Sequence, residues 1–117
     1  MRKLHQLTVF SLVTVFLGAC VSLEELAPPV DEAFIHTAGV SSSEIPQLKR
    51  GRYLYTARCG SCHSLDKVDS YTYKEWIDIM DVEEMASKSK FTSKDTEDVL
   101  AYIKKAMIVA KKLPASK

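Results

Sequence analysis

The chain has 117 residues, 46% of them hydrophobic, and its 16 lysines and arginines nearly balance its 15 aspartates and glutamates. This length suits one small domain, and the near-zero net charge argues against the broad basic surface that nucleic-acid binding requires. With only 4 Gly, 4 Pro and 3 Cys, the composition also excludes collagen-like, low-complexity and disulfide-dense chains.

The N-terminus has the layout of a secretory signal. Arg2 and Lys3 precede an apolar run over residues 7–19, whose last residues are small. As a helix this run would cover roughly 20 Å, less than the roughly 30 Å hydrocarbon core of a bilayer, so a spanning helix is disfavoured. The sequence therefore predicts a signal peptide over residues 1–19 and an exported mature chain.

The tetrapeptide at residues 17–20, Leu-Gly-Ala-Cys, resembles the lipobox of bacterial lipoproteins. The resemblance implies that Cys20 is acylated and becomes the mature N-terminus. The protein is then expected to be lipid-anchored to a bacterial membrane and to face the periplasm or the cell exterior. The alternative is an ordinary cleaved signal that happens to contain a cysteine.

Residues 20–47 are expected to form the lipidated cysteine and a flexible tether. A Pro-Pro pair, a third proline and a run of three serines interrupt any sustained apolar period in this segment. A flexible coil of this length would span roughly 30 Å. The alternative is that the turn at 23–26 and the Phe34-Ile35 pair pack on the domain.

The most informative segment is Cys59-Gly60-Ser61-Cys62-His63, a C-x-x-C-H string. Two thiols at this spacing can form thioethers with the two vinyl groups on one edge of a porphyrin, and His63 is then held under the iron as its proximal ligand. The string therefore predicts one covalently attached haem c. A large apolar ring would also complete the core of so small a chain.

Other uses of a cysteine pair fit this sequence less well. A thioredoxin-like site needs a strand before the motif, whereas residues 51–58 are predicted to be helical. A structural zinc site needs about four ligands, and beyond the motif the mature chain offers only Cys20 and His36. A disulfide between Cys59 and Cys62 would close a loop too small to contribute much entropy.

Two helices are predicted after the motif. Residues 73–84 place Trp76, Ile77 and Met80 on one face. The last helix is expected to begin after an N-cap at Thr92 or Ser93, with acidic residues in its first turns and lysines toward its end. Its apolar stripe comprises Val99, Leu100, Tyr102, Ile103 and Ala106, with Met107 alongside.

The sixth ligand of the iron has four candidates in the mature chain, namely His36, Met80, Met85 and Met107. Met80 and Met107 lie in apolar stripes and are first expected to pack in the core. His36 could reach the iron only if the tether folded back. Met85 precedes a polar stretch in which a helix can end and a side chain can turn inward.

Residues 48–112 resemble a small class I, single-haem cytochrome c. The resemblance rests on Gly51 and Tyr55 ahead of the C-x-x-C-H string, on Trp76, and on the Val-Leu-Ala-Tyr-Ile run at 99–103. It implies an all-α fold in which the N-terminal and C-terminal helices cross beside the covalently bound haem. It also implies a cytochrome c domain over residues 48–113 with a short tail at 114–117.

The same resemblance implies that His63 and a downstream methionine are the axial ligands. The spacing to the terminal helix favours Met85, with Met80 as the runner-up. A haem iron with both faces occupied has no open position for oxygen or peroxide, and it exchanges single electrons.

The sequence therefore predicts a membrane-tethered one-electron carrier that is not an enzyme and that meets redox protein partners transiently. Scattered basic residues near the haem edge, Arg52, Arg58 and Lys67, are candidates for steering an acidic partner. The alternative is a haem sensor or a peroxidase-like centre whose sixth ligand can be displaced.

Overall fold

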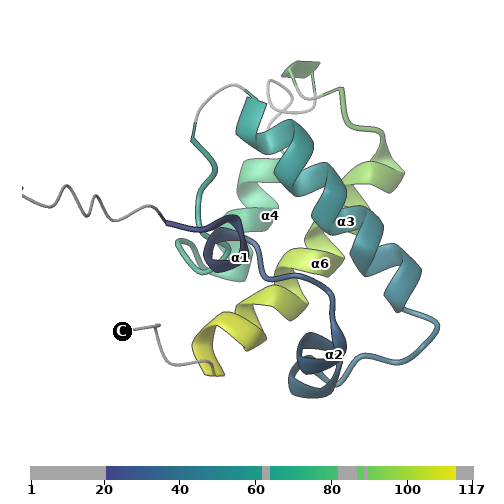
Figure 1. Cartoon of the computed structure of the whole chain (residues 1–117). Coiled ribbons are helices and arrows are strands. Elements are labelled where there is room, and N and C mark those ends of the chain that lie inside the picture. The colour runs from purple at the N-terminus through teal and green to yellow at the C-terminus, as the bar shows by residue number, and fades with distance from the viewer. Residues whose placement is uncertain (1–20, 62–63, 82–86, 89, 113–117) are drawn as a thin grey trace, which may run out of the picture.

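The computed structural model describes residues 21–61, 64–81, 87–88 and 90–112. Within these residues the fold is all-helical, as expected, and contains no strand (Figure 1). In chain order the elements are α1 (Leu23–Leu26), α2 (Glu32–Ala38), α3 (Ile45–Arg58), the short 3₁₀ helix η1 (Cys59–Ser61), α4 (Tyr73–Asp81) and α6 (Ser93–Lys112).

Capping boxes start helices α4 and α6. The Thr92 hydroxyl accepts a hydrogen bond from the Asp95 amide at 3.1 Å, and the Asp95 carboxylate accepts one from the Thr92 amide at 2.9 Å. Thr72 and Glu75 form the same reciprocal pair ahead of α4. Thr92 is therefore the N-cap of α6. The predicted extension of α4 to residue 84 lies outside the described residues.

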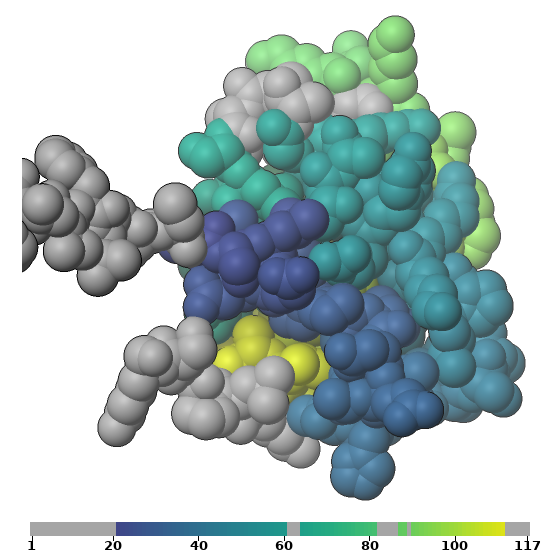
Figure 2. All heavy atoms as spheres, in the orientation of Figure 1, coloured from purple at the N-terminus to yellow at the C-terminus, as the bar shows by residue number. Residues whose placement is uncertain are grey.

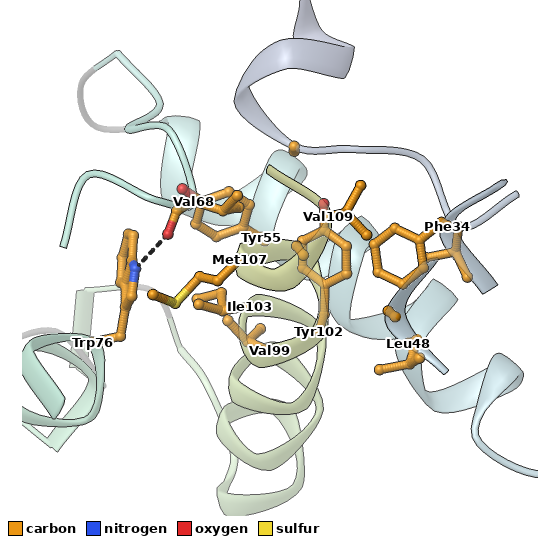
Figure 3. Close-up of a cluster of buried hydrophobic side chains, with 14 of the residues drawn as sticks. Phe34, Leu48, Tyr55, Val68, Trp76, Val99, Tyr102, Ile103, Met107 and Val109 are labelled. Carbon is orange, nitrogen blue, oxygen red and sulfur yellow. Dashed lines mark hydrogen bonds between the residues drawn. The ribbon is translucent and has the colours of Figure 1, made fainter. Parts of the chain in front are cut away.

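Helix α6 lies at the centre of the core, with α3 packed against it (Figure 1). Gly51 permits their close approach, because a Cβ atom there would overlap the backbone carbonyl of Asp98 and lie 2.8 Å from the Tyr102 Cβ. The inward face of α6 is buried among residues of the other helices (Figure 3). Its buried hydrophobic residues are Val99, Tyr102, Ile103, Ala106, Met107 and Val109.

The buried face of α4 agrees with the predicted apolar stripe only in part. Trp76 and Met80 are buried, as expected, but Ile77 is 41% exposed. Ile79 packs against the core in its place. Successive residues in a helix differ by about 100°, so Ile77 points well away from Trp76, whereas Ile79 and Met80 lie one turn below it.

Residues 21–47 do not form the expected tether. Helices α1 and α2 fold onto the domain, and Phe34 in α2 is 1% exposed. Its ring stacks on that of Tyr102 in α6, with centroids 6.1 Å apart. Figure 2 shows the purple and blue residues of this segment lying over the yellow end of α6. The structure thus supports the alternative, in which the segment packs on the domain.

Local signals explain why this segment folds. The Asp31 side chain caps α2 by accepting a hydrogen bond from the Phe34 amide at 2.9 Å, and Gly39 ends the helix with a left-handed φ of 62°. Pro28 and Pro29 lie between α1 and α2, and Pro46 lies in the first turn of α3, where a helix tolerates proline. Helix α3 begins at Ile45, and the packed helices α1 and α2 precede it, so the folded domain starts well before the predicted boundary at residue 48.

Candidate functional site

A largely apolar cavity of about 220 Å³ lies beside the first cysteine of the C-x-x-C-H string. Its walls come from α3, η1, the loop at 64–72 and α4. The lining residues are Tyr55, Cys59, Leu65, Asp66, Tyr71, Trp76, Ile79 and Met80.

Three aromatic rings give the cavity a rigid wall. Trp76 makes edge-to-face contacts with Tyr71 and Tyr55, with ring centroids 5.0 Å and 5.8 Å apart. The Trp76 indole donates a hydrogen bond to the Val68 carbonyl at 2.8 Å (Figure 3). The Tyr55 hydroxyl donates to the Asp66 carbonyl. Because these polar atoms already have partners, the rings offer the cavity mainly carbon surface.

The thiol of Cys59, in the wall of the cavity, is not activated as a nucleophile. Cys59 is partly buried, and burial raises the pKa of its thiol to about 11. A redox-active cysteine of the thioredoxin kind needs a lowered pKa, because the thiolate is the nucleophile. No group of three or more His, Cys, Asp or Glu side chains in the described part of the chain could hold a metal ion. The raised pKa of the Cys59 thiol therefore does not favour thiol exchange.

A comparison with protein families gives one match: the model of the cytochrome C1 family covers residues 34–115. This match takes in most of the chain, including the C-x-x-C-H string. The chain belongs to the cytochrome C1 family. Comparisons with curated proteins and with solved structures find no match.

Membership of the cytochrome C1 family makes the protein a c-type cytochrome, which implies a c-type haem and an electron-transfer role rather than an enzymatic one. The match begins at Phe34, inside the segment that was expected to be a tether. Family membership and burial therefore agree that at least the second half of this segment belongs to the domain.

The cavity fits the haem that the cytochrome C1 family implies. A c-type haem needs apolar walls and two thiols at one edge, and the described residues supply an aromatic wall and the first of these thiols, Cys59. Asp66 is the one charged side chain among the lining residues, and its carboxylate accepts a hydrogen bond from the Tyr71 hydroxyl at 3.4 Å. The remainder of the lining is aromatic, aliphatic or sulfur-bearing.

The structure describes only some of the predicted site residues. Cys59 lies in the cavity wall, whereas Cys62, His63, Met85 and Cys20 lie outside the described residues.

The other three candidates for the sixth ligand are all described. Met80 is 5% exposed and lines the cavity. Met107, on α6, is buried in the core of the domain, as expected, and is not among the lining residues. His36 is exposed on α2 and does not line the cavity either.

Sequence reasoning missed the contribution of the loop after the motif. Leu65, Asp66 and Tyr71 form one side of the cavity, yet the loop has no apolar period that would mark them. One signal was available, since residues that directly follow an attachment motif must pass close to the attached group. Tyr71, five residues before Trp76 and flanked by polar residues, was the most informative of the three.

Proposed function

We propose that the protein is a membrane-anchored one-electron carrier with one haem c joined to Cys59 and Cys62 by thioethers. In this proposal His63 is the proximal ligand and Met85 the distal ligand of the iron. The finer fold is that of a small class I cytochrome c, with α3 and α6 crossing beside the haem. The observation that carries the proposal is the apolar cavity that opens on Cys59, the first residue of the C-x-x-C-H string.

When bound, the haem supplies one reversible electron through its iron, and methionine ligation raises its reduction potential. The residues of this chain hold and shield that group. Tyr55, Tyr71 and Trp76 form a fixed apolar wall that excludes water, and exclusion of water keeps the reorganisation on electron exchange small. Met80 fills part of the same wall.

The anchor in this proposal is the acylated Cys20 of an exported lipoprotein that faces the periplasm or the cell exterior. In the described residues, no helix has both the length and the apolar character needed to cross a bilayer. Several acyl chains on one cysteine would hold a small domain firmly, because each buried methylene contributes about 0.8 kcal/mol.

Redox partners are expected to dock weakly and briefly. The three basic residues considered for steering are engaged within the fold. Arg52 donates to the Ala27 carbonyl, Arg58 pairs with Asp95, and Lys67 pairs with Asp69. Steering by these three residues should therefore be modest, and the partner surface should depend mainly on the exposed haem edge.

The proposal is tested on the full chain produced with a haem-attachment machinery. Acidified organic solvent should leave the pigment on the denatured chain, and the mass of the mature protein should report one haem and the acyl groups. Cys59→Ala should weaken retention of the pigment, whereas Gly60→Ala should not. A pigment that leaves the wild-type chain would refute covalent attachment.

Two variants separate the methionines. Met85→Ala should open the sixth position and lower the reduction potential, whereas Met80→Ala should mainly loosen packing, at about 2 to 5 kcal/mol of unfolding free energy. If Met80→Ala lowered the reduction potential and Met85→Ala did not, Met80 would be the sixth ligand of the iron. Rapid binding of carbon monoxide by the reduced wild-type protein would instead favour a sensor or a peroxidase-like centre.

A further inference from the structure

The first residues that the structure describes expose large apolar side chains. Val21 is 57% exposed and Leu23 is 49% exposed, although Ala27 a few residues later is completely buried. Helix α1 starts directly at this point, because the Ser22 hydroxyl accepts a hydrogen bond from the Glu25 amide at 3.3 Å. The apolar pair therefore sits at the place where the chain from residue 20 enters the domain.

The segment after α1 is fastened to the rest of the domain. The carbonyls of three consecutive residues, 26–28, accept hydrogen bonds from three separate parts of the fold. The donors are the Val68 amide at 3.0 Å, Arg52 Nε at 3.1 Å and the Tyr102 hydroxyl at 2.8 Å. Helix α1 consequently has little freedom to move away from the domain.

We propose that Val21 and Leu23 insert into the lipid interface beside the anchor, so that α1 lies on the bilayer and the domain keeps one orientation on the membrane. The inference rests on the proposed acylation of Cys20. One extended residue spans at most about 3.6 Å, so acyl chains on Cys20 bring Val21 to the membrane surface. Acylation of Cys20 therefore places a lipid surface directly beside this apolar pair, and we take that surface as its binding partner.

Charge indicates which lipids the surface suits. Glu24 and Glu25 lie beside the apolar pair and are exposed. Acidic side chains are repelled by an anionic leaflet, so the contact should be stronger on neutral phosphatidylcholine than on anionic lipid.

This contact would also fix the position of the cavity. The loop that donates the Val68 amide to α1 carries Leu65, Asp66 and Tyr71 of the cavity wall. An α1 that rests on the bilayer would hold this wall at a constant distance from the membrane. A flexible tether would instead let the cavity swing through roughly 30 Å.

The orientation is tested with the acylated holoprotein in oriented phosphatidylcholine bilayers, after its mass has shown both haem and acyl groups. Linear dichroism of the haem band should be clearly different from zero. The double variant Val21→Ser with Leu23→Ser should reduce the dichroism to less than a third of the wild-type value. Tyr53→Ser is the matched control, because Tyr53 is 68% exposed on α3 and should leave the dichroism unchanged.

A second readout does not depend on haem. Nitroxide labels at Glu24→Cys and at His36→Cys, both exposed positions, are compared for access to lipid-soluble oxygen and to a water-soluble nickel reagent. The first label should lie in the interface and the second in water. If both labels lie in water and the dichroism is zero in an acylated holoprotein, the inference is wrong while the proposed carrier stands. A mature chain without acyl groups overturns both the anchor and the inference.

Discussion

Gly51 is the residue on which the contact between α3 and α6 depends most directly. A methyl group at this position would overlap the Asp98 carbonyl, which belongs to a helix backbone and cannot rotate away. Gly51→Ala should therefore lower the unfolding free energy of the holoprotein by about 3 kcal/mol, at the upper end of the usual cost of overpacking. Denaturant unfolding followed by circular dichroism measures this loss.

Gly60→Ala is the control for this substitution. A Cβ at Gly60 would meet its nearest neighbour, the Leu65 Cβ, at 3.7 Å, which is an ordinary contact. Its effect should stay below about 0.5 kcal/mol. Equal effects at the two glycines would show that α3 and α6 do not approach as closely as described.

A second feature at the residue scale is a pair of buried carboxylates on α6. Asp98 is 1% exposed and accepts hydrogen bonds from Arg50 at 2.5 Å, Lys94 at 2.7 Å and Gln47 at 3.0 Å. Asp95 accepts from Arg50 at 2.5 Å. Arg50 thus joins α3 to both acids, and removing one partner would leave a buried charge without full compensation.

Asp95 should make stability depend on acid pH. The Thr92 amide, together with Arg50, lowers the pKa of the Asp95 carboxyl to about 2. The unfolded chain has a pKa of about 3.9 for such a group, so it binds a proton first as the pH falls. The stabilisation is therefore complete above about pH 5 and is lost between about pH 4 and pH 2.

The measurement is the unfolding free energy at a series of acid pH values for the wild type and Asp95→Asn. The variant should lose stability less steeply below pH 4, because its side chain takes up no proton. Both proteins share every other acid-sensitive group, so only the difference between the curves is informative. Parallel curves would contradict the role given to Asp95.

At the scale of elements, the segment ahead of α3 behaves as part of the core. Phe34→Ala removes a fully buried ring that stacks on Tyr102 and should cost about 3 to 5 kcal/mol of unfolding free energy. His36→Ala, an exposed change in the same helix, should cost less than about 0.5 kcal/mol and leave the haem spectrum unchanged. Urea unfolding distinguishes them. A flexible tether would make both changes neutral.

The elements differ in how far they could be predicted. Helix α6 was recognisable because its apolar residues repeat with the helical period, and Thr92 marked its start. Burial of Ala27 and Ala38 was not recognised, and packing of Phe34 on the domain was raised only as the alternative, because the Pro-Pro pair at 28–29 breaks any regular apolar period. Burial in that segment is decided by tertiary contacts with α6, which no local pattern records.

The same division holds for the candidate site. The C-x-x-C-H string carries its chemistry in its spacing, so the attachment of haem could be predicted from the sequence. Tyr71 and Leu65 line the cavity because of where the loop lies, and hydrogen bonds from Trp76 to Val68 and from Tyr55 to Asp66 tie this loop to α4 and α3. Side chains placed by such long-range contacts need a structure to reveal them.

At the scale of the whole molecule, the core is small and includes an apolar cavity of about 220 Å³. A sealed empty apolar cavity costs about 24 cal/mol for each Å³, so filling this partly open one contributes at most about 5 kcal/mol. That is comparable with the entire stability of many small domains. The protein without haem should therefore be marginally stable, although side chains cap the starts of α1, α2, α4 and α6.

The last prediction compares the chain produced with and without haem attachment. The holoprotein should exceed the haem-free form by up to about 5 kcal/mol of unfolding free energy, measured by urea denaturation. Leu65→Ala changes a residue that lines the cavity and should reduce this difference. Leu48→Ala changes a core residue that does not line the cavity and should lower the unfolding free energy of both forms equally. If the two forms unfold at the same urea concentration, the cavity is not where the haem resides, because a ring bound elsewhere would leave the cavity empty in both.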